Sequence, residues 1–220
     1  ALAHTCAQAG AHVIVSARSE EGHQAVVSAL HAEGGSAEGV TLDVTQEESV
    51  RRAVSEVIER HGRIDALVNC AGVAKVFPFL DFPVGNFLAT MEVNVTGTFL
   101  CAQHAARLML RNRWGRIVNV ASTAGLKGYP YVSAYVAAKH GLAGFTKAIA
   151  LELATHGITA NCISPGYVWT PLVENQIPDT MAARGLSREA VINDVLLAKQ
   201  PTKSFILPED VAAMALFLCS

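Results

Sequence analysis

The sequence has little charge and no long apolar run. Only 16% of its 220 residues are charged, the net charge is −2, and Lys and Arg never form a run. Nucleic acids and anionic membrane surfaces attract proteins through clustered positive charge, so we expect neither as a partner. No segment approaches the roughly 20 uncharged apolar residues of a membrane-spanning helix, and the apolar start lacks a basic leading segment. We therefore expect a soluble, cytoplasmic protein.

The sequence also lacks the short spacings that mark metal sites and disulfide frameworks. None of the cysteines form a C-x-x-C element, and the eight histidines include no H-x-x-x-H pair. We therefore expect no metal site and no disulfides. All five cysteines are interpreted as small buried apolar residues, namely Cys6, Cys70, Cys101, Cys162 and Cys219.

Short apolar segments alternate with long amphipathic ones through most of the chain. The expected strands are HVIVSA, GVTLDV, DALVNCAG, GRIVNVAS and ITANCISPG, each of the first four followed by a helical segment. This rhythm predicts an α/β fold, a doubly wound parallel sheet covered by helices on both faces. The strands at 66–68 and 117–120 are almost wholly apolar, which predicts central positions. With 51% hydrophobic residues the chain is expected to form one domain.

Two local signals refine this pattern. Thr45 followed by Glu48 resembles a capping box for a helix running to about His61, and Gly62 then stands where a left-handed helix terminator is favoured. The stretch from Tyr167 to Pro208 is polar and interrupted by prolines. It is expected to lie outside the sheet as a mobile lid.

Three residues carry the chemistry expected of a proton-transfer site. Tyr135 and Lys139 are four residues apart in a helical stretch and therefore project from one face of the helix. An ammonium beside a phenol lowers the pKa of the phenol and suits it for general acid/base work. Ser122 ends a strand, where its hydroxyl could hydrogen-bond a substrate oxygen as charge develops. Taken singly, a surface Tyr/Lys pair or a strand-end Ser is more often structural.

Taken together, these residues resemble the short-chain dehydrogenase/reductase family over essentially the whole chain. The motifs stand in the family's order: Asp43-Val44, Asn69-Cys70-Ala71-Gly72, Asn94, Ser122, Tyr135 with Lys139, and Pro165-Gly166 leading to Thr170. The resemblance implies a Rossmann-like, three-layer α/β/α domain over 1–220 with a lid at 167–208. It also implies a nicotinamide cofactor, catalysis by Ser122, Tyr135 and Lys139, and an Asn94 that holds a water near Lys139.

The cofactor contacts implied by the resemblance lie at strand ends. The implied set is Arg18, Asp43, Val44, Asn69, Ala71, Gly72, Tyr135, Lys139, Pro165, Gly166, Val168 and Thr170. Enzymes that use NAD often carry an acidic residue after the strand HVIVSA, but this chain has Ala17 and Arg18 there. An Arg suits the 2′-phosphate of NADP, so we expect NADP(H) in preference to NAD(H).

By the resemblance, segments should precede Ala1 and follow Ser220. The family's glycine-rich phosphate loop and first strand would come before the start, and one more strand would follow the end, so the sequence is expected to be incomplete. The first strand would lie in the middle of the sheet. Its absence would leave unpaired backbone on both flanking strands and favour aggregation or weak cofactor binding.

The later part of the chain is most similar to 3-hydroxybutyrate dehydrogenases, and STAGLKGYPYVSAY is similar to 3-oxoacyl and polyketide ketoreductases. The implied substrate positions are Ala74, Ala124, Val132, Tyr167 and Gln176, of which only Gln176 keeps the polar type that grips a small carboxylate. Lys75 or Lys127 could compensate at the pocket mouth. A 3-hydroxyacyl or 3-oxoacyl compound is common to both resemblances, with 3-hydroxybutyrate favoured and a 3-oxoacyl thioester as the alternative.

Two further expectations concern assembly and turnover. The resemblance implies that the helical segments 84–110 and 134–154 pair across a two-fold axis, giving a homodimer or homotetramer. The alternative, that their apolar faces pack only on their own sheet, is equally compatible with the sequence. A catalytically silent NADP-binding scaffold is the non-enzymatic alternative, and the intact Ser122, Tyr135 and Lys139 set argues against it.

Overall fold

A computed structural model describes residues 1–198 and 200–220 and confirms an α/β fold. Among these residues the strands are β1 (His12–Ala17), β2 (Ser36–Thr41), β3 (Ala66–Asn69), β4 (Gly115–Val120) and β5 (Ile158–Ile163). β1 pairs with β2, and β3, β4 and β5 form a second sheet in that order, with every pairing parallel. β4 is central as predicted, whereas β3 lies at the edge of its sheet, so the prediction of a central position was wrong for β3.

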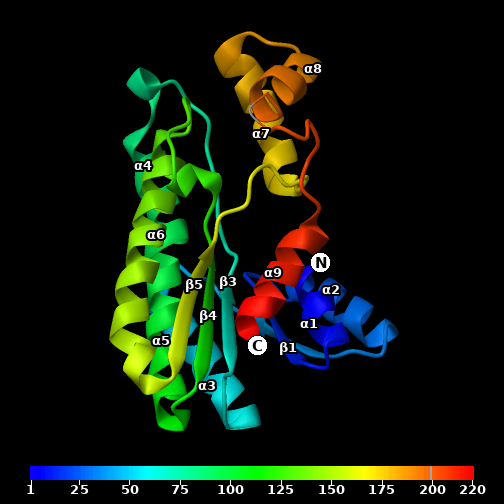
Figure 1. Ribbon diagram of the computed structural model, residues 1–220, viewed down its shortest axis with the longest axis vertical. Coiled ribbons are helices and arrows are strands. Elements are labelled where there is room, and N and C mark those ends of the chain that lie inside the picture. Colours follow the sequence, from blue (N-terminus) through cyan, green and yellow to red (C-terminus); the bar gives the residue numbers. More distant parts are fainter. Residues whose placement is uncertain (199) are drawn as a thin grey trace.

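Helices follow the strands as the alternation predicts. They are α1 (Leu2–Gln8), α2 (Glu20–Ala32), α3 (Glu47–His61), α4 (Val84–Met91), α5 (Gly97–Asn112), α6 (Ser133–Leu153), α7 (Pro171–Arg184), α8 (Arg188–Ala190) and α9 (Pro208–Cys219). In Figure 1, α5 and α6 cover one side of the β3–β5 sheet and α9 covers the other. α2 packs on β1 and β2, and α1 packs on α9. No helix of the described residues is long and apolar enough to cross a membrane.

The core consists of several buried clusters between these layers. The largest lies between α5, β4 and β5 and contains Met109, Ile117 and Ile158, each at most 1% exposed. A second cluster joins α2 to β1 and β2 through Val27 and Leu30. Burial of such side chains stabilises a fold by about 1.5–3 kcal/mol each. The two sheets are therefore each anchored by helices of their own.

The predicted capping box is not formed. The Thr45 hydroxyl donates to Asp43 Oδ1 at 2.7 Å, and the residue that caps α3 is Gln46, without a side-chain cap. A carboxylate two residues away is a closer partner for the hydroxyl than the first turn of the helix. Gly62 does end α3 in the left-handed conformation, with φ 73°, as predicted.

The helical segment 84–110 is interrupted. A π-helical turn, Glu92–Thr96, separates α4 from α5 and contains the fully buried Asn94. π turns insert an extra residue into the helical ladder and often mark functional sites. The segment 134–154, in contrast, is almost wholly contained in α6.

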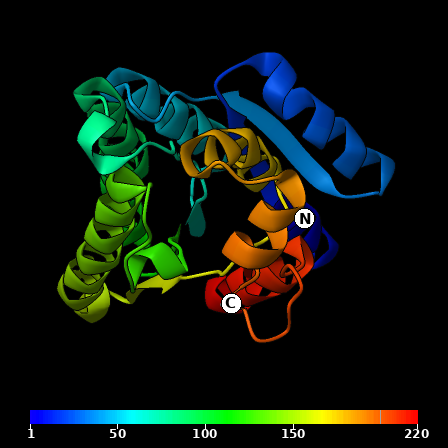
Figure 2. The same cartoon turned by 90° about the horizontal axis from the view of Figure 1, so that it is seen from above.

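The residues expected to form a lid extend beyond the carboxyl ends of the strands, at the top of Figure 1. α7, α8 and a π turn at Val191–Leu196 pack around their own small core of Ile177, Val191 and Leu196. Figure 2 shows this unit from above, apart from α5 and α6. Lys199 of the predicted lid lies outside the described residues.

Candidate active site

The catalytic candidates meet where β4 ends and α6 begins. Ser122 follows β4 and caps a single 3₁₀ turn, its Oγ accepting a hydrogen bond from the backbone N–H of Ala124 at 3.1 Å. Tyr135 and Lys139 lie in the first turns of α6, one helical turn apart, and the Lys139 Nζ is 5.5 Å from the centre of the Tyr135 ring. The spacing of four residues therefore brings the two side chains together as predicted.

Lys139 is almost completely buried, with 4% of the residue exposed. Its Nζ donates to the carbonyl of Val120, the last residue of β4, at 2.7 Å. Burial lowers the pKa of Lys139 to about 8, although the nearby thiols of Cys70 and Cys162 act to raise it. The ammonium is thus held by the strand end and exchanges its proton near neutral pH.

The pKa of Tyr135 departs from the sequence expectation. Burial raises it above its ordinary value, while hydrogen bonding with Ser122 lowers it and the Cys70 thiol raises it further. Lys139 directs its ammonium toward the Val120 carbonyl and the ring face rather than the phenol oxygen. The expectation that Lys139 lowers the phenol pKa is therefore not met in this arrangement, where burial is the largest cause of the shift and the pKa is raised.

Asn94 lies beside this group with one unused acceptor. Its amide nitrogen donates to the carbonyls of Val73 at 2.8 Å and Thr90 at 2.9 Å, while its buried Oδ1 has no partner. A Cβ added to Gly72 would lie 2.9 Å from this oxygen and 3.8 Å from Lys139 Nζ. Gly72 therefore keeps open a small space bordered by a hydrogen-bond acceptor and an ammonium, which is what a bridging water needs.

The implied cofactor residues line the carboxyl ends of the strands. Asp43 follows β2, and its carboxylate accepts hydrogen bonds from the backbone and hydroxyl of Thr45, which lower its pKa with help from the charge of Arg18. Asn69 ends β3 and donates to Asn119 on β4 at 2.9 Å. After β5, Pro165 accepts a hydrogen bond from Thr123, and Val168 forms an isolated bridge with Ile206. Ligands of open parallel sheets bind along this edge.

The residues at this edge fit a nicotinamide dinucleotide. The partnerless Asn94 Oδ1, the space kept open by Gly72 and the buried Lys139 lie near the ends of β3 and β4, whereas Arg18 and Asp43 follow β1 and β2. All five cysteines were expected to be buried, but only Cys101 is; Cys70, in the turn after β3, is exposed, and Cys6, Cys162 and Cys219 are half-buried, so the expectation was wrong for these four. The five cysteines are free thiols.

The implied substrate residues contribute only partly to one cavity. Val132, Tyr167 and Gln176 line a small cavity between the α6 entry and α7, together with Tyr131 and Arg184. Ala124 is buried nearby at 4% exposure, and Ala74 is not among the lining residues. Lys75 is exposed, and the Lys127 ammonium lies 5.4 Å from the centre of the Tyr129 ring.

Arg184 is the site residue that sequence reasoning missed. It ends α7, its guanidinium stacks 4.6 Å from the centre of the Tyr131 ring, and its buried Nε has no partner. Tyr131 has a left-handed backbone conformation, with φ 69°, which is uncommon for a residue other than glycine. Its ring is the one on which the Arg184 guanidinium stacks. No sequence spacing links 131 with 184, so no local pattern could have revealed the pair.

The comparisons with known proteins decide the family. The model of the short chain dehydrogenase family matches residues 1–180. The chain belongs to this family. A D-beta-hydroxybutyrate dehydrogenase of Rhizobium meliloti is 44% identical over 99% of this chain and 85% of its own length. A 3-oxoacyl-[acyl-carrier-protein] reductase of Synechocystis is 35% identical over 100% of this chain and 83% of its own.

Solved structures agree with this short-chain dehydrogenase in fold. An actinorhodin polyketide ketoreductase variant crystallised with NADPH superimposes with a TM-score of 0.94 at 35% identity, over 100% of this chain and 84% of its own. A gluconate 5-dehydrogenase of Burkholderia cenocepacia, in complex with NADP and tartrate, gives 0.89 at 32% identity, over 100% of this chain and 82% of its own. The Rossmann-like fold, the oxidoreductase class and a nicotinamide cofactor, NAD(P), are thereby confirmed.

Proposed function

We propose that this short-chain dehydrogenase interconverts a 3-hydroxyacyl and a 3-oxoacyl compound, with 3-hydroxybutyrate and acetoacetate as its pair. The observation that carries the proposal is the cavity lined by Gln176 and Arg184, which borders the start of α6 at Val132, although Ser122, Tyr135 and Lys139 are not among its lining residues. An amide and a guanidinium with a free Nε suit a small carboxylate, since charge-assisted hydrogen bonds to Arg are among the strongest in proteins. The 44% identity with a D-beta-hydroxybutyrate dehydrogenase supports the same substrate.

The proton is moved by the residues at the start of α6. Tyr135 donates it to the substrate oxygen during reduction and accepts it during oxidation, while the Ser122 hydroxyl hydrogen-bonds the same oxygen. Lys139 and a water held by Asn94 Oδ1 return the proton to solvent. The bound nicotinamide cofactor supplies or accepts the hydride. The pKa of Lys139, about 8, suits a relay that works near neutral pH.

For the cofactor we propose a preference for NADP(H). Arg18 stands just after β1, close enough to Asp43 for its charge to lower the pKa of that carboxyl, and is itself exposed. A guanidinium at this strand end matches the 2′-phosphate of NADP, whereas Ala17 offers no carboxylate to the ribose hydroxyls of NAD. Asp43, Val44, Asn69, Ala71, Gly72, Pro165, Gly166, Val168 and Thr170 are proposed to hold the rest of the cofactor.

The alternative is a reductase of 3-oxoacyl thioesters or polyketides. It is favoured by the apolar Ala74, Ala124 and Val132, which cannot grip a free carboxylate. The similarity to a 3-oxoacyl-[acyl-carrier-protein] reductase and to a polyketide ketoreductase supports it too. A silent NADP-binding scaffold is disfavoured because the proton-moving residues are all present.

Initial rates decide between these functions. Acetoacetate and an acetoacetyl thioester are each offered with NADPH and with NADH. Faster turnover of free acetoacetate supports the 3-hydroxybutyrate assignment, and faster turnover of the thioester overturns it in favour of the alternative. No turnover of either substrate, with the cofactor still bound, supports the scaffold. Equal rates with NADH and NADPH contradict the cofactor preference.

We also propose a homodimer or homotetramer formed through α4, α5 and α6. The support is a set of large apolar side chains exposed on or beside these helices, namely Phe79, Leu80, Val84, Leu88, Phe99 and Leu151. Exposed apolar patches of this kind mark association surfaces. Light scattering of the purified protein tests the assignment, and a monomeric mass contradicts it. The cytoplasmic location stays a prediction.

A further inference from the structure

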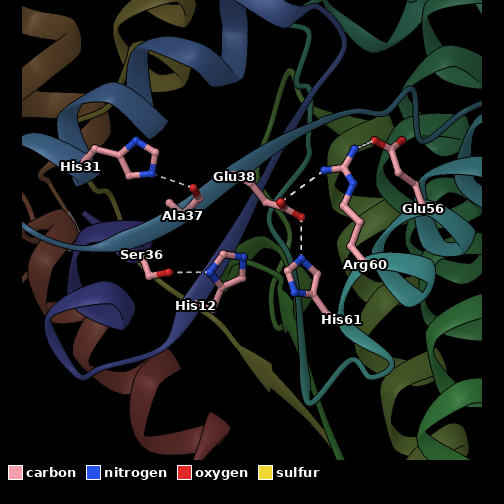
Figure 3. Close-up of polar contacts among 8 residues, drawn as sticks. All are labelled: His12, His31, Ser36, Ala37, Glu38, Glu56, Arg60 and His61. Carbon is pink, nitrogen blue, oxygen red and sulfur yellow. Dashed lines mark hydrogen bonds and ion pairs between the residues drawn. The ribbon is translucent and has the colours of Figure 1, made fainter.

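Two histidines and a glutamate from three elements meet at a distance from the catalytic residues. His12 is the first residue of β1, Glu38 lies on β2, and His61 is the last residue of α3. One ligand atom of each lies within 4.8 Å of the others. His12 begins its strand, whereas the active site lies where the strands end, so the cluster belongs to the other end of the sheet. Figure 3 shows the three side chains pointing toward one another.

The side chains are held in orientations that suit ligation. His61 Nε2 is 2.7 Å from Glu38 Oε1, and the His12 and His61 rings are tilted at 41° with their centres 4.6 Å apart. His12 Nδ1 hydrogen-bonds the Ser36 hydroxyl at 2.7 Å. This contact fixes the ring and leaves Nε2, which Figure 3 shows directed toward the other two side chains, free to bind a cation.

The backbone beneath the cluster is rigid. His12 pairs with Ser36, and Ile14 pairs with Glu38, in the parallel ladder of β1 and β2. Ala53 and Val57 of α3 pack against β1 and β2 in one buried cluster, so the end of this helix is fixed relative to the strands. Sites built on strands and helices keep their geometry better than sites on loops.

The surrounding charge permits a cation. One carboxylate oxygen of Glu38 forms an ion pair with Arg60 at 3.2 Å. Arg60 also pairs with Glu56, so the positive charge of Arg60 is divided between two carboxylates (Figure 3).

We infer that His12, Glu38 and His61 form a binding site for a divalent transition-metal ion, with Zn²⁺ as the best match. Two imidazoles and a carboxylate are ligands typical of Zn²⁺, whereas Mg²⁺ and Ca²⁺ take oxygen ligands. Ligand atoms about 2 Å from a tetrahedral Zn²⁺ lie roughly 3.3 Å apart, so the separations here need only small side-chain rotations. Water completes the coordination. The ion joins β1, β2 and α3.

No metal site was expected from the sequence, because only closely spaced ligands form a recognisable sequence pattern. His12 and His61 are far apart in the chain. They meet because β1 pairs with β2 in parallel and because α3, which follows β2, ends beside these strands. The inference does not depend on the proposed catalytic function, because none of its residues belongs to the active site.

Calorimetric titration of the metal-free protein with ZnCl₂ tests the site. One Zn²⁺ per chain is expected, with a rise in melting temperature, and MgCl₂ is expected to give neither. His12→Gln and His61→Gln should each weaken Zn²⁺ binding by more than about 100-fold, since even a residue that only orients a ligand is worth about 10–100-fold. Ser36→Ala, which removes the residue that orients His12, should weaken Zn²⁺ binding by about 10–100-fold. Visible absorption of the Co²⁺ form reports whether the bound ion is four-coordinate, and its loss in His12→Gln and His61→Gln would tie that coordination to the histidines.

His4 offers a matched control. Its Nδ1 lies 2.9 Å from Glu33 Oε2, the same imidazole–carboxylate pair without a second histidine, so His4→Gln should leave Zn²⁺ binding unchanged. His31→Gln is a second control, because its ring bonds only the Ala37 carbonyl (Figure 3). The inference is overturned if the wild-type protein binds no Zn²⁺, or if His12→Gln and His61→Gln bind it as the wild type does.

Discussion

The Nζ of Lys139 donates to the carbonyl of Val120 at 2.7 Å, which ties helix α6 to the end of the central strand β4. The same strand leads directly into Ser122, and Gly125 lies so close to α6 that an added Cβ would sit 2.6 Å from the Lys139 carbonyl. The positions of Ser122, Tyr135 and Lys139 are therefore fixed by one junction between a strand and a helix. Substitutions at this junction are therefore expected to alter the positions of these three side chains.

The burial of Lys139 makes protein stability depend on pH. Its pKa is about 8 in the folded protein and 10.5 when exposed, so the unfolded state binds more protons between these values. The contribution of Lys139 to the free energy of unfolding should accordingly rise from pH 8 to pH 10, by at most roughly 1.4 kcal/mol per pH unit. Buried thiols such as Cys101, with a pKa raised to about 11, act in the opposite direction.

The Lys139 contribution is isolated by comparing variants. Urea unfolding at pH 8, 9 and 10 is measured for the wild type and for Lys139→Met, and the difference in stability between them should change with pH. Lys147→Met, which alters an exposed lysine of the same helix, should follow the wild type. Parallel profiles for wild type and Lys139→Met would show that Lys139 does not titrate in this range.

Replacing Tyr135 with Phe removes the proposed proton donor and little else. Turnover should fall by about 10²–10⁴-fold, the usual contribution of a positioned acid/base group. Cofactor affinity, measured by fluorescence titration with NADPH, should stay within a factor of a few. Turnover that stays at the wild-type level would remove Tyr135 from the mechanism.

Gly72→Ala tests the space beside Asn94. The new Cβ would lie 2.9 Å from Asn94 Oδ1, and Asn94 cannot retreat because its amide is bonded to Val73 and Thr90. We expect a loss of about 1–3 kcal/mol in stability, the usual effect of overpacking, together with a lower kcat as the water is displaced.

The matched change is Gly85→Ala, where nothing lies within 4 Å of the added carbon. Urea unfolding and steady-state rates are measured for both variants. If Gly72→Ala keeps the stability and kcat of Gly85→Ala, the space beside Asn94 has no part in the relay.

Arg184→Met tests the carboxylate anchor. Loss of a charge-assisted hydrogen bond of about 1.5–3 kcal/mol should raise the KM for acetoacetate by about 10–100-fold. The KM for an acetoacetyl thioester, which carries no carboxylate at that position, should change far less. Arg188→Gln serves as the control, because Arg188 is paired with Glu174 on the lid surface, 3.6 Å away. Equal effects on both substrates would exclude Arg184 as the anchor.

Much of the site could be predicted from the sequence because its groups are close together in the chain. Tyr135 and Lys139 meet through one turn of α6, and Ser122 follows the strand that the apolar run Ile117–Val120 predicts. Helix periodicity and strand ends are local properties. The existence of the five strands and the left-handed Gly62 were predictable for the same reason, although β2 begins and ends three residues earlier than the predicted segment GVTLDV.

Other features depended on residues distant in the chain. The burial that raises the pKa of Tyr135 follows from packing that no local pattern encodes. The same holds for the stacking of Arg184 on Tyr131.

The sequence by itself determined the order of strands and helices, the candidate catalytic trio and the family. The tertiary structure alone decided which separated side chains share a site, as with His12, Glu38 and His61. The physical reason is that hydrophobic periodicity and helix spacing act over a few residues. The proximity and burial of side chains, in contrast, are set by the pairing of parallel strands and by the packing of helices against them.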